Sequence, residues 1–190
     1  MIGKTIHELA AGDVAELVHR VAPDDVAGFV EAVGDYNPIH SDPQYAATTP
    51  FRAPIAPGVY TAGLISAVIG TQLPGPGAIY LSQSLKFIKP VMLGDTITAR
   101  VTVVEVIRER NRIRLLTVCR NQRDEEVLTG EAWVMPSRES IVYERPEPVA
   151  AFAALALQPW TWVTQAMTLW ATLGLTMLEA ATPRRTSESA

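Results

Sequence analysis

The chain has 190 residues, of which 48% are hydrophobic and 19% charged, enough for one domain with a sizeable core and an appendage. Its net charge of -4 and isoelectric point near 5.4 give no reason to expect a nucleic acid as a partner. A single cysteine, Cys119, excludes an internal disulfide, and we interpret it as a small buried hydrophobic residue. The N-terminus lacks the apolar stretch of a secretory signal, so we expect a cytoplasmic protein.

The first elements in chain order are a strand and a short helix. Residues 13–21 alternate weakly between apolar and polar side chains, which predicts an opening strand. Residues 22–35 then predict a helix, and Asp24 or Asp25 is expected to cap it. Gly34 is its expected C-terminal stop. The apolar stripe of this helix consists of Val26, Phe29, Val30 and Val33.

Residues 34–56 are interpreted as a loop, because prolines interrupt regular hydrogen bonding and restrict the residue before each of them. These prolines are Pro38, Pro43, Pro50 and Pro54. Residues 57–73, PGVYTAGLISAVIGTQL, are apolar nearly all round and predict a helix buried in the middle of the domain. The sequence LPGPG ends this helix.

From Ala78 onward the period of the apolar residues changes to two. Four runs rich in β-branched residues predict strands, namely residues 78–90, 95–109, 112–122 and 125–136. Their separators are short and polar, which favours an antiparallel meander. One apolar helix followed by long antiparallel strands predicts an α+β protein, a hot-dog fold in which an antiparallel sheet wraps around a long central helix.

Two ionisable side chains, Asp35 and His40, lie five residues apart in the stretch VGDYNPIHSDPQYAA. A loop pinned by Pro38 and Pro43 can fix both side chains. A carboxylate and a neutral imidazole that share a water form a general acid/base pair near neutral pH. The alternative interpretation is structural, with Asp35 in a turn at the helix end and His40 as an ordinary loop histidine.

The other two histidines, His7 and His19, are interpreted as structural residues. His7 lies in the N-terminal segment, and His19 lies in the predicted opening strand. Neither has a neighbouring motif that indicates chemistry. The candidate site therefore depends on His40.

The stretch GDYNPIHSDPQYAATTPF, with the ordered blocks that follow it, resembles the MaoC-like hydratase family. Within that family it is most similar to the (R)-specific enoyl-CoA hydratases that supply (R)-3-hydroxyacyl-CoA for polyhydroxyalkanoate synthesis. The resemblance covers about residues 5–136. It implies a hot-dog fold, a homodimer with active sites at the subunit contact, and an acyl-CoA thioester as substrate. No metal or redox cofactor is expected.

The resemblance also implies roles for individual residues. Asp35 and His40 match the family's catalytic pair, which activates the water that adds across the double bond. Gly58 matches the glycine whose backbone N–H binds the thioester oxygen, and Ser66 matches a serine near the catalytic pair. The remaining residues of the motif are interpreted as shaping the loop, and they are Asn37 and Pro38.

The chemistry of hydration requires residues of these types. A base must take a proton from water as its oxygen attacks C3, an acid must protonate C2, and donors must hold the charge on the thioester oxygen. A free N–H at the start of a helix is a suitable donor. The family often has histidine before the glycine, whereas this chain has Pro57. Proline leaves the Gly58 N–H free, but any contact of the usual histidine is lost.

The sequence predicts three parts. These are a MaoC-like hot-dog domain in residues 1–136, a linker with charges and prolines in residues 137–147, and an apolar C-terminal helical extension with a polar tail in residues 148–190. In residues 159–178 threonines recur every three or four positions, while tryptophans and other apolar residues occupy the rest of the helix surface.

Three interpretations of residues 159–178 stay open. The segment is a helix lying on a membrane or on the surface of a polyester granule, a membrane span, or a helix that packs on its own domain or on a dimer partner. The first would place a cytoplasmic enzyme at a granule or membrane surface.

The leading hypothesis is (R)-specific hydration of trans-2-enoyl-CoA to (R)-3-hydroxyacyl-CoA. One alternative is a 3-hydroxyacyl-thioester dehydratase of fatty-acid synthesis, which runs the same chemistry in reverse on an acyl carrier protein. Another is a non-catalytic acyl-thioester or granule-surface binding protein. The presence of both Asp35 and His40 argues against this last alternative, because binding alone does not need a paired acid and base.

Overall fold

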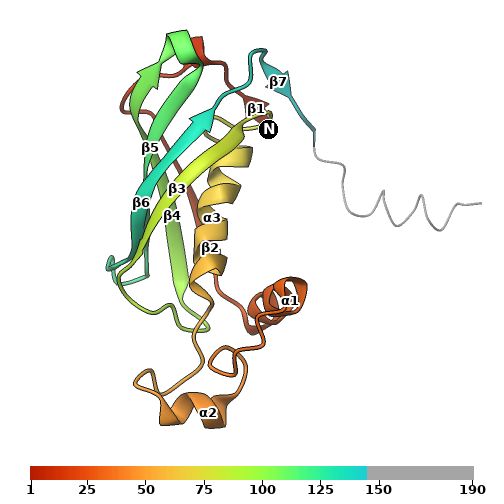
Figure 1. Ribbon diagram of the computed structural model, residues 1–190, viewed down its shortest axis with the longest axis vertical. Coiled ribbons are helices and arrows are strands. Elements are labelled where there is room, and N and C mark those ends of the chain that lie inside the picture. Colours follow the sequence, from red (N-terminus) through yellow and green to blue (C-terminus); the bar gives the residue numbers. More distant parts are fainter. Residues whose placement is uncertain (145–190) are drawn as a thin grey trace, which may run out of the picture. The chain divides into compact units, whose positions relative to one another are not determined.

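A five-stranded antiparallel sheet forms the framework of the protein, as seen in a computed structural model that describes residues 1–144 (Figure 1). In chain order its strands are β2 (Val14–Arg20), β3 (Ile79–Phe87), β4 (Thr96–Ile107), β5 (Arg112–Arg120) and β6 (Glu126–Met135). Each of the five predicted strands is therefore confirmed. Their alternating side chains place one apolar row on the inner face of the sheet.

The spatial order of the strands is β2-β4-β5-β6-β3. β4, β5 and β6 are consecutive neighbours, but β3 pairs with β6 at one edge and β2 pairs with β4 at the other. The predicted meander is therefore wrong for β3. The period of the apolar residues shows which side chains face the core, but it does not identify the neighbouring strand.

The helix α3 (Gly58–Thr71) packs on the inner face of this sheet, which confirms the hot-dog arrangement (Figure 1). Its buried residues are Tyr60, Thr61, Leu64, Ile65, Val68 and Ile69. They share one core with fully buried strand residues such as Ile97 and Leu115, and each buried aliphatic side chain contributes about 1.5–3 kcal/mol. The expectation of burial all round is wrong on one side, because Gly63, Ser66 and Gly70 are exposed.

The helix α1 (Pro23–Val33) follows β2, as predicted. Its N-cap residue is Ala22 rather than Asp24 or Asp25, but the Asp25 carboxylate accepts a hydrogen bond from the Ala22 N–H at 3.3 Å. Gly34 ends the helix with a φ of 75°, in the left-handed region that glycine favours. Val33 does not belong to the buried stripe, because it is 57% exposed at the end of the helix.

The predicted loop of residues 34–56 contains a short helix, α2 (Pro43–Thr48). The Asp42 side chain caps it by accepting hydrogen bonds from the N–H groups of Gln44 and Tyr45. Pro43 occupies the first helical position, where its missing N–H costs nothing. The prediction of a structureless loop is wrong here because proline starts a helix as readily as it interrupts one. Figure 1 shows α1 and α2 beyond the end of the sheet at which α3 begins.

A two-stranded sheet joins the N-terminus to residues near the end of the described chain. β1 (Ile2–Gly3) pairs with β7 (Ile141–Val142), so part of the segment expected to be a linker forms a strand. Two short 3-10 helices, Ile6–Glu8 and Arg108–Arg110, complete the elements. Within residues 1–144 no helix combines the length and the apolarity that a membrane span needs. The C-terminal extension lies outside the described residues, and the domain boundaries stay predictions.

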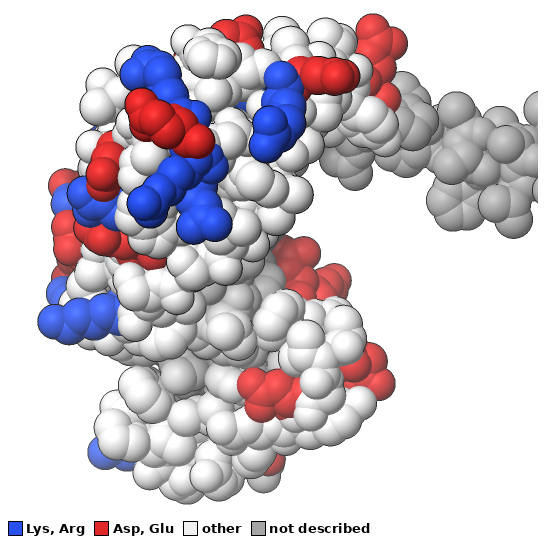
Figure 2. Space-filling view, turned by 45° about the horizontal axis from the view of Figure 1, so that its top comes forward, with Lys and Arg blue, Asp and Glu red and all other residues white. Residues whose placement is uncertain are grey.

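Ion pairs balance the charges on the outer face of the sheet. The guanidinium of Arg114 lies 3.0 Å from a carboxylate oxygen of Glu105 and 2.8 Å from one of Glu131. These carboxylates raise the pKa of Arg114. On the face shown in Figure 2, basic and acidic side chains are intermingled rather than separated into a broad basic area. Exposed pairs of this kind add little to stability, because water and salt screen the charges.

Candidate active site

Asp35 is placed by the end of α1. The N–H groups of Gly34 and Asp35 both donate to the carbonyl oxygen of Val30, at 2.8 and 3.2 Å. The left-handed conformation of Gly34 allows this double contact, because the chain must turn back over the last carbonyls of the helix. The Asp35 backbone is therefore fixed to α1, while its side chain is 41% exposed.

His40 is placed by a tight loop around Asn37 and Pro38. The side-chain oxygen of Asn37 accepts a hydrogen bond from the Ile39 N–H at 3.3 Å, and its backbone carbonyl accepts one from the His40 N–H at 3.1 Å. The carbonyl of Pro38 accepts from the Asp42 N–H at 2.8 Å. A short polar side chain that bonds to the backbone two residues later stabilises a turn without regular structure.

The structure brings Asp35 and His40 together. The Nε2 atom of His40 lies 3.6 Å from Oδ2 of Asp35, and the His40 side chain is 9% exposed. On the other side of the ring, Nδ1 lies 2.8 Å from the carbonyl oxygen of Ile55. A carbonyl oxygen only accepts, so Nδ1 carries the proton and, in the neutral ring, Nε2 carries the lone pair. A basic nitrogen and a carboxylate oxygen therefore face the same small space.

Two acceptors at this separation are suited to binding one water molecule. A distance of 3.6 Å is too long for a direct hydrogen bond. One water beside the pair can donate one hydrogen to each acceptor, which leaves the lone pairs of its oxygen free. This arrangement orients a nucleophilic oxygen and provides a base for its proton.

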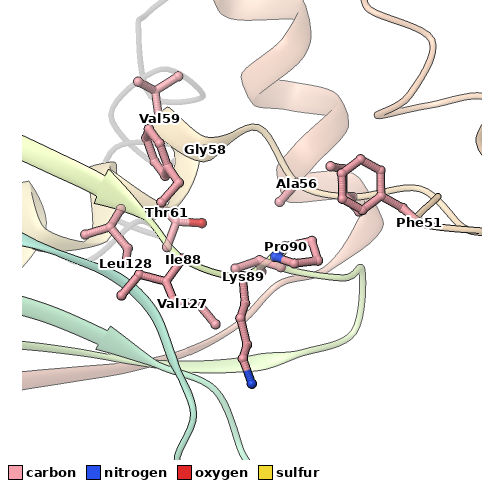
Figure 3. A pocket seen from close by; sticks show the side chains of 13 residues that line it. Phe51, Ala56, Gly58, Val59, Thr61, Ile88, Lys89, Pro90, Val127 and Leu128 are labelled. Carbon is pink, nitrogen blue, oxygen red and sulfur yellow. The ribbon is translucent and has the colours of Figure 1, made fainter. Parts of the chain in front are cut away.

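Gly58 lies on the wall of an apolar pocket of about 520 Å³ at the start of α3 (Figure 3). Thirteen residues line the pocket: Phe51, Ile55, Ala56, Gly58, Val59, Thr61, Phe87, Ile88, Lys89, Pro90, Val91, Val127 and Leu128. As the first residue of the helix, Gly58 has an N–H with no acceptor inside the helix. The positive end of the helix dipole adds to its ability to bind a negative oxygen.

A side chain at position 58 would collide with an aromatic ring. A Cβ atom built on Gly58 would lie 2.7 Å from Cε1 of Phe87, which is closer than carbon atoms approach without repulsion. Glycine thus keeps the backbone N–H accessible between the helix start and the ring. Lys89 is less central, because Figure 3 shows its side chain extending away from Gly58 and Val59.

The Asp35–His40 pair is joined to this pocket through Ile55. Neither Asp35 nor His40 lines the pocket wall, but Ile55 does. The carbonyl of Ile55 accepts from the His40 ring, and its N–H donates to the carbonyl of Ile39 at 3.2 Å. The residue that holds the imidazole therefore also forms part of the apolar wall.

Ser66 is the candidate residue that the structure does not bring to this site. It lies on the exposed side of α3, eight residues after Gly58, which corresponds to roughly 12 Å along the helix axis. Within residues 1–144 no hydrogen bond joins it to Asp35 or His40. Its role beside the catalytic pair stays a prediction.

Most of the pocket walls were not among the residues predicted from the sequence. Phe87 and Ile88 end β3 and enter the next turn, while Val127 and Leu128 lie in β6. In the structure the first two are large apolar residues that stay exposed at a strand end, with 54% exposure for Phe87, but the sequence carries no signal of this exposure. Alternation alone does not show which end of a strand meets a ligand.

Comparison with known proteins shows which family of proteins the chain is similar to. The sequence pattern described as "MaoC like domain" matches residues 10–123. Over 133 residues the chain is 51% identical to a 3-hydroxybutyryl-CoA dehydratase of Methylorubrum extorquens, covering 70% of this chain and 84% of that protein. Over 132 residues it is 45% identical to an (R)-specific enoyl-CoA hydratase of Rhodospirillum rubrum, covering 69% and 91%.

A solved structure shows the same relationship. The unliganded R-hydratase PhaJ1 from Pseudomonas aeruginosa superimposes with a TM-score of 0.71 at 41% sequence identity, covering 77% of this chain and 96% of that one. The similarity therefore includes both the hot-dog architecture and a large fraction of the residues. On these grounds the chain belongs to the MaoC-like family of hydratases and dehydratases.

Proposed function

We propose that this protein catalyses the (R)-specific hydration of trans-2-enoyl-CoA to (R)-3-hydroxyacyl-CoA. The observation that carries the proposal is the contact of His40 Nδ1 with the Ile55 carbonyl, at 2.8 Å, which directs the basic Nε2 toward the carboxylate of Asp35. Relatives named (R)-specific enoyl-CoA hydratase, at 43–45% identity, support the choice of reaction and stereochemistry.

The pair supplies both proton transfers of the reaction. A water that donates its hydrogens to Asp35 and His40 attacks C3 of the enoyl thioester with its oxygen, and the pair takes one of its protons as the C–O bond forms. The π electrons of the double bond move toward the thioester oxygen. The pair then returns a proton to C2, so that H and OH add overall and the pair regains its starting state.

Gly58 stabilises the charge that develops during this addition. The thioester oxygen becomes enolate-like as the water attacks, and an N–H at a helix start is a donor oriented before the reaction begins. Loss of one such donor typically costs about 10²–10³ in kcat. The apolar walls around Gly58 accommodate the acyl chain and exclude bulk water, which strengthens the hydrogen bond.

A homodimer is part of the proposal. β3 lies at the edge of the sheet, and an uncovered edge invites pairing with another chain. Large apolar side chains are exposed on it and just after it, namely Ile79, Leu81, Phe87 and Ile88. A second copy that covers this edge would also come close to Gly58, because Phe87 lies against it.

Hydration of crotonyl-CoA tests the proposal. The loss of enoyl-thioester absorbance reports turnover, and dehydrogenases specific for (R)- or (S)-3-hydroxyacyl-CoA identify the product. We expect turnover with an (R)-product. Turnover only when the crotonyl group is carried by an acyl carrier protein would instead support the dehydratase of fatty-acid synthesis. Binding of crotonyl-CoA without turnover of either thioester would support a binding protein.

The proposed association of residues 159–178 with a granule or membrane surface rests on the sequence alone. These residues lie outside the described part of the chain. The hydration chemistry does not depend on them, because every residue assigned to it lies between Asp35 and Ser66.

A further inference from the structure

A second histidine–carboxylate contact lies at the junction of three elements. The Nε2 atom of His19, in β2, is 2.8 Å from the hydroxyl oxygen of Tyr60 and 3.2 Å from Oδ2 of Asp25. Tyr60 belongs to the first turn of α3, and Asp25 belongs to the first turn of α1. One ring nitrogen thus contacts both helices. No local pattern predicts this contact, because His19 and Asp25 are distant from Tyr60 along the chain.

The hydrogen-bond roles follow from the chemistry of the partners. A carboxylate only accepts, so the contact with Asp25 requires a proton on Nε2 of His19, which the hydroxyl oxygen of Tyr60 shares. Burial, followed by the negative charge of Asp25, raises the pKa of Tyr60, so its hydroxyl stays protonated near neutral pH. The N–H of His19 therefore lies between the Tyr60 hydroxyl oxygen and the Asp25 carboxylate.

In the described part of the chain, the contacts between α1 and α3 are made by side chains. Within residues 1–144 no backbone hydrogen bond joins the two helices. The ring of Phe29, in α1, packs edge-on against Tyr60 with a centroid distance of 5.7 Å and an interplanar angle of 84°. Tyr60 is therefore linked to α1 in two ways. Its ring packs directly on Phe29, and its hydroxyl contacts His19, which in turn contacts Asp25.

This connection matters because the two halves of the candidate site belong to different segments. Asp35 follows the end of α1, and its N–H is bonded to Val30. His40 is bonded instead to Ile55, at the entrance to α3, where Gly58 also lies. We therefore expect a movement of α1 relative to α3 to change the distance between Asp35 and His40, which is 3.6 Å in this structure.

We infer that Tyr60 and His19 are positioning residues for the proposed hydration, which hold α1 against the first turn of α3 and so set the placement of Asp35 relative to His40 and Gly58. The inference rests on the proposed function for its catalytic consequence. Neither residue touches the reacting atoms. Misplacement of a catalytic group by about 1 Å can cost on the order of 10²-fold in rate.

The test uses Tyr60→Phe, which removes the hydroxyl but keeps the ring on Phe29. We expect kcat for crotonyl-CoA hydration to fall at least about tenfold, with KM within about twofold of wild type, since the acyl pocket is untouched. The matched control is Tyr143→Phe, because Tyr143 is exposed near β7 and its hydroxyl has no hydrogen-bond partner among the described residues. It should leave kcat unchanged.

Variants of His19 separate positioning from general stability. His19→Ala should reduce kcat as Tyr60→Phe does, whereas His19→Gln should restore most of it, because a glutamine amide can donate from nearly the same place as Nε2. If Tyr60→Phe and His19→Ala keep kcat within about twofold of wild type, the inference is wrong. A loss that appears only together with a lowered melting temperature and a raised KM would also contradict it.

A measurement without turnover distinguishes failure of this inference from failure of the proposed function. In amide NMR spectra, Tyr60→Phe should shift the signals of Gly34 and Asp35, and Tyr143→Phe should not. If the wild-type protein hydrates no enoyl thioester, the proposed function fails while these shifts still decide whether Tyr60 positions α1. Unchanged Gly34 and Asp35 signals would overturn the inference.

Discussion

The imidazole of His40 is held by the carbonyl oxygen of Ile55, 2.8 Å from its Nδ1 atom. This contact settles which ring nitrogen is basic, because the carbonyl requires a proton on Nδ1 and leaves the lone pair on Nε2. Since Ile55 also lines the apolar pocket, the same residue orients the proposed base and forms part of the wall of the pocket proposed for the acyl chain. Such a second contact fixes both the tautomer and the direction of a catalytic histidine.

Removing either member of the pair should abolish most of the hydration. We expect Asp35→Asn and His40→Gln each to lower kcat/KM for crotonyl-CoA by about 10²–10⁴-fold, because an amide oxygen can still accept a hydrogen bond from the water but cannot take its proton. The kcat/KM of the double variant should be only slightly lower than that of the less active single variant, since the two residues act as a unit. Initial rates and melting temperatures check this.

The control for this series is Asp24→Asn, which removes an exposed carboxylate from the first turn of α1. It lowers the negative charge by the same amount as Asp35→Asn without touching the pair. Hydration by Asp35→Asn or His40→Gln within about tenfold of wild type would contradict the proposed mechanism.

The arrangement of Gly58 and Phe87 provides a test of the oxyanion role. Gly58→Ala should lower kcat, because its Cβ would lie 2.7 Å from the Phe87 ring and would crowd the approach of the thioester to the backbone. The methyl group can lower kcat either by displacing the Phe87 ring or by covering the Gly58 N–H. The variant Phe87→Ala separates these two causes. If the methyl group acts only by displacing the ring, the double variant Gly58→Ala with Phe87→Ala regains the rate of Phe87→Ala alone.

We expect the double variant to stay at least about tenfold slower than Phe87→Ala, since the methyl group still covers the N–H when the ring is gone. Steady-state kinetics of the three variants decide the matter. Full recovery in the double variant would show that Gly58 serves the packing of Phe87 and does not bind the thioester oxygen.

The elements of this fold were predictable wherever one face of a segment is buried. The alternation of Ile113, Leu115 and Cys119 follows the inner face of β5, and all three are fully buried. The place of β3 at the edge was not predictable, because its partner β6 comes after β4 and β5 in the chain, and alternation does not identify a distant partner. Likewise α2 was missed, since Pro43 has opposite effects at the start and in the interior of a helix.

The sequence predicted the chemistry of the candidate site but not the residues that hold Asp35 and His40 in place. The spacing of Asp35 and His40 in a loop with two prolines already indicated a shared site. The contact of His40 with Ile55 spans fifteen residues of chain, and that between His19 and Tyr60 spans forty-one. No local pattern encodes such distances, so the residues that orient the pair emerge only from the folded structure.

The single cysteine should be inert in the folded protein. Cys119 has no exposed surface, and burial raises the pKa of its thiol to about 12. The thiolate is the reactive form, so we expect no reaction with a disulfide reagent at about pH 8 until the protein unfolds. One thiol per chain should then react in denaturant. Rapid reaction in native buffer would contradict the burial of β5 against α3.

Glu125 should make the stability of the protein dependent on pH in the acid range. Hydrogen bonds from Asn121, Lys89 and Arg123, at 2.8, 2.7 and 2.9 Å, lower the pKa of Glu125 from 4.5 to about 2. The folded state therefore binds the proton of Glu125 less readily than the unfolded state does. The ionised carboxylate stabilises the fold fully at pH values above 4.5, and this contribution is lost as the pH falls toward about 2.

Urea unfolding of Glu125→Gln and wild type over this range checks the prediction. The variant should be less stable near neutral pH, and the difference should shrink steadily once the pH falls below 4.5, since wild-type Glu125 then loses its own charge on unfolding. Glu139→Gln is the control, because Glu139 is exposed and forms no ion pair among the described residues. A difference that is constant with pH would mean that Glu125 acts through its shape and hydrogen bonds rather than through its charge.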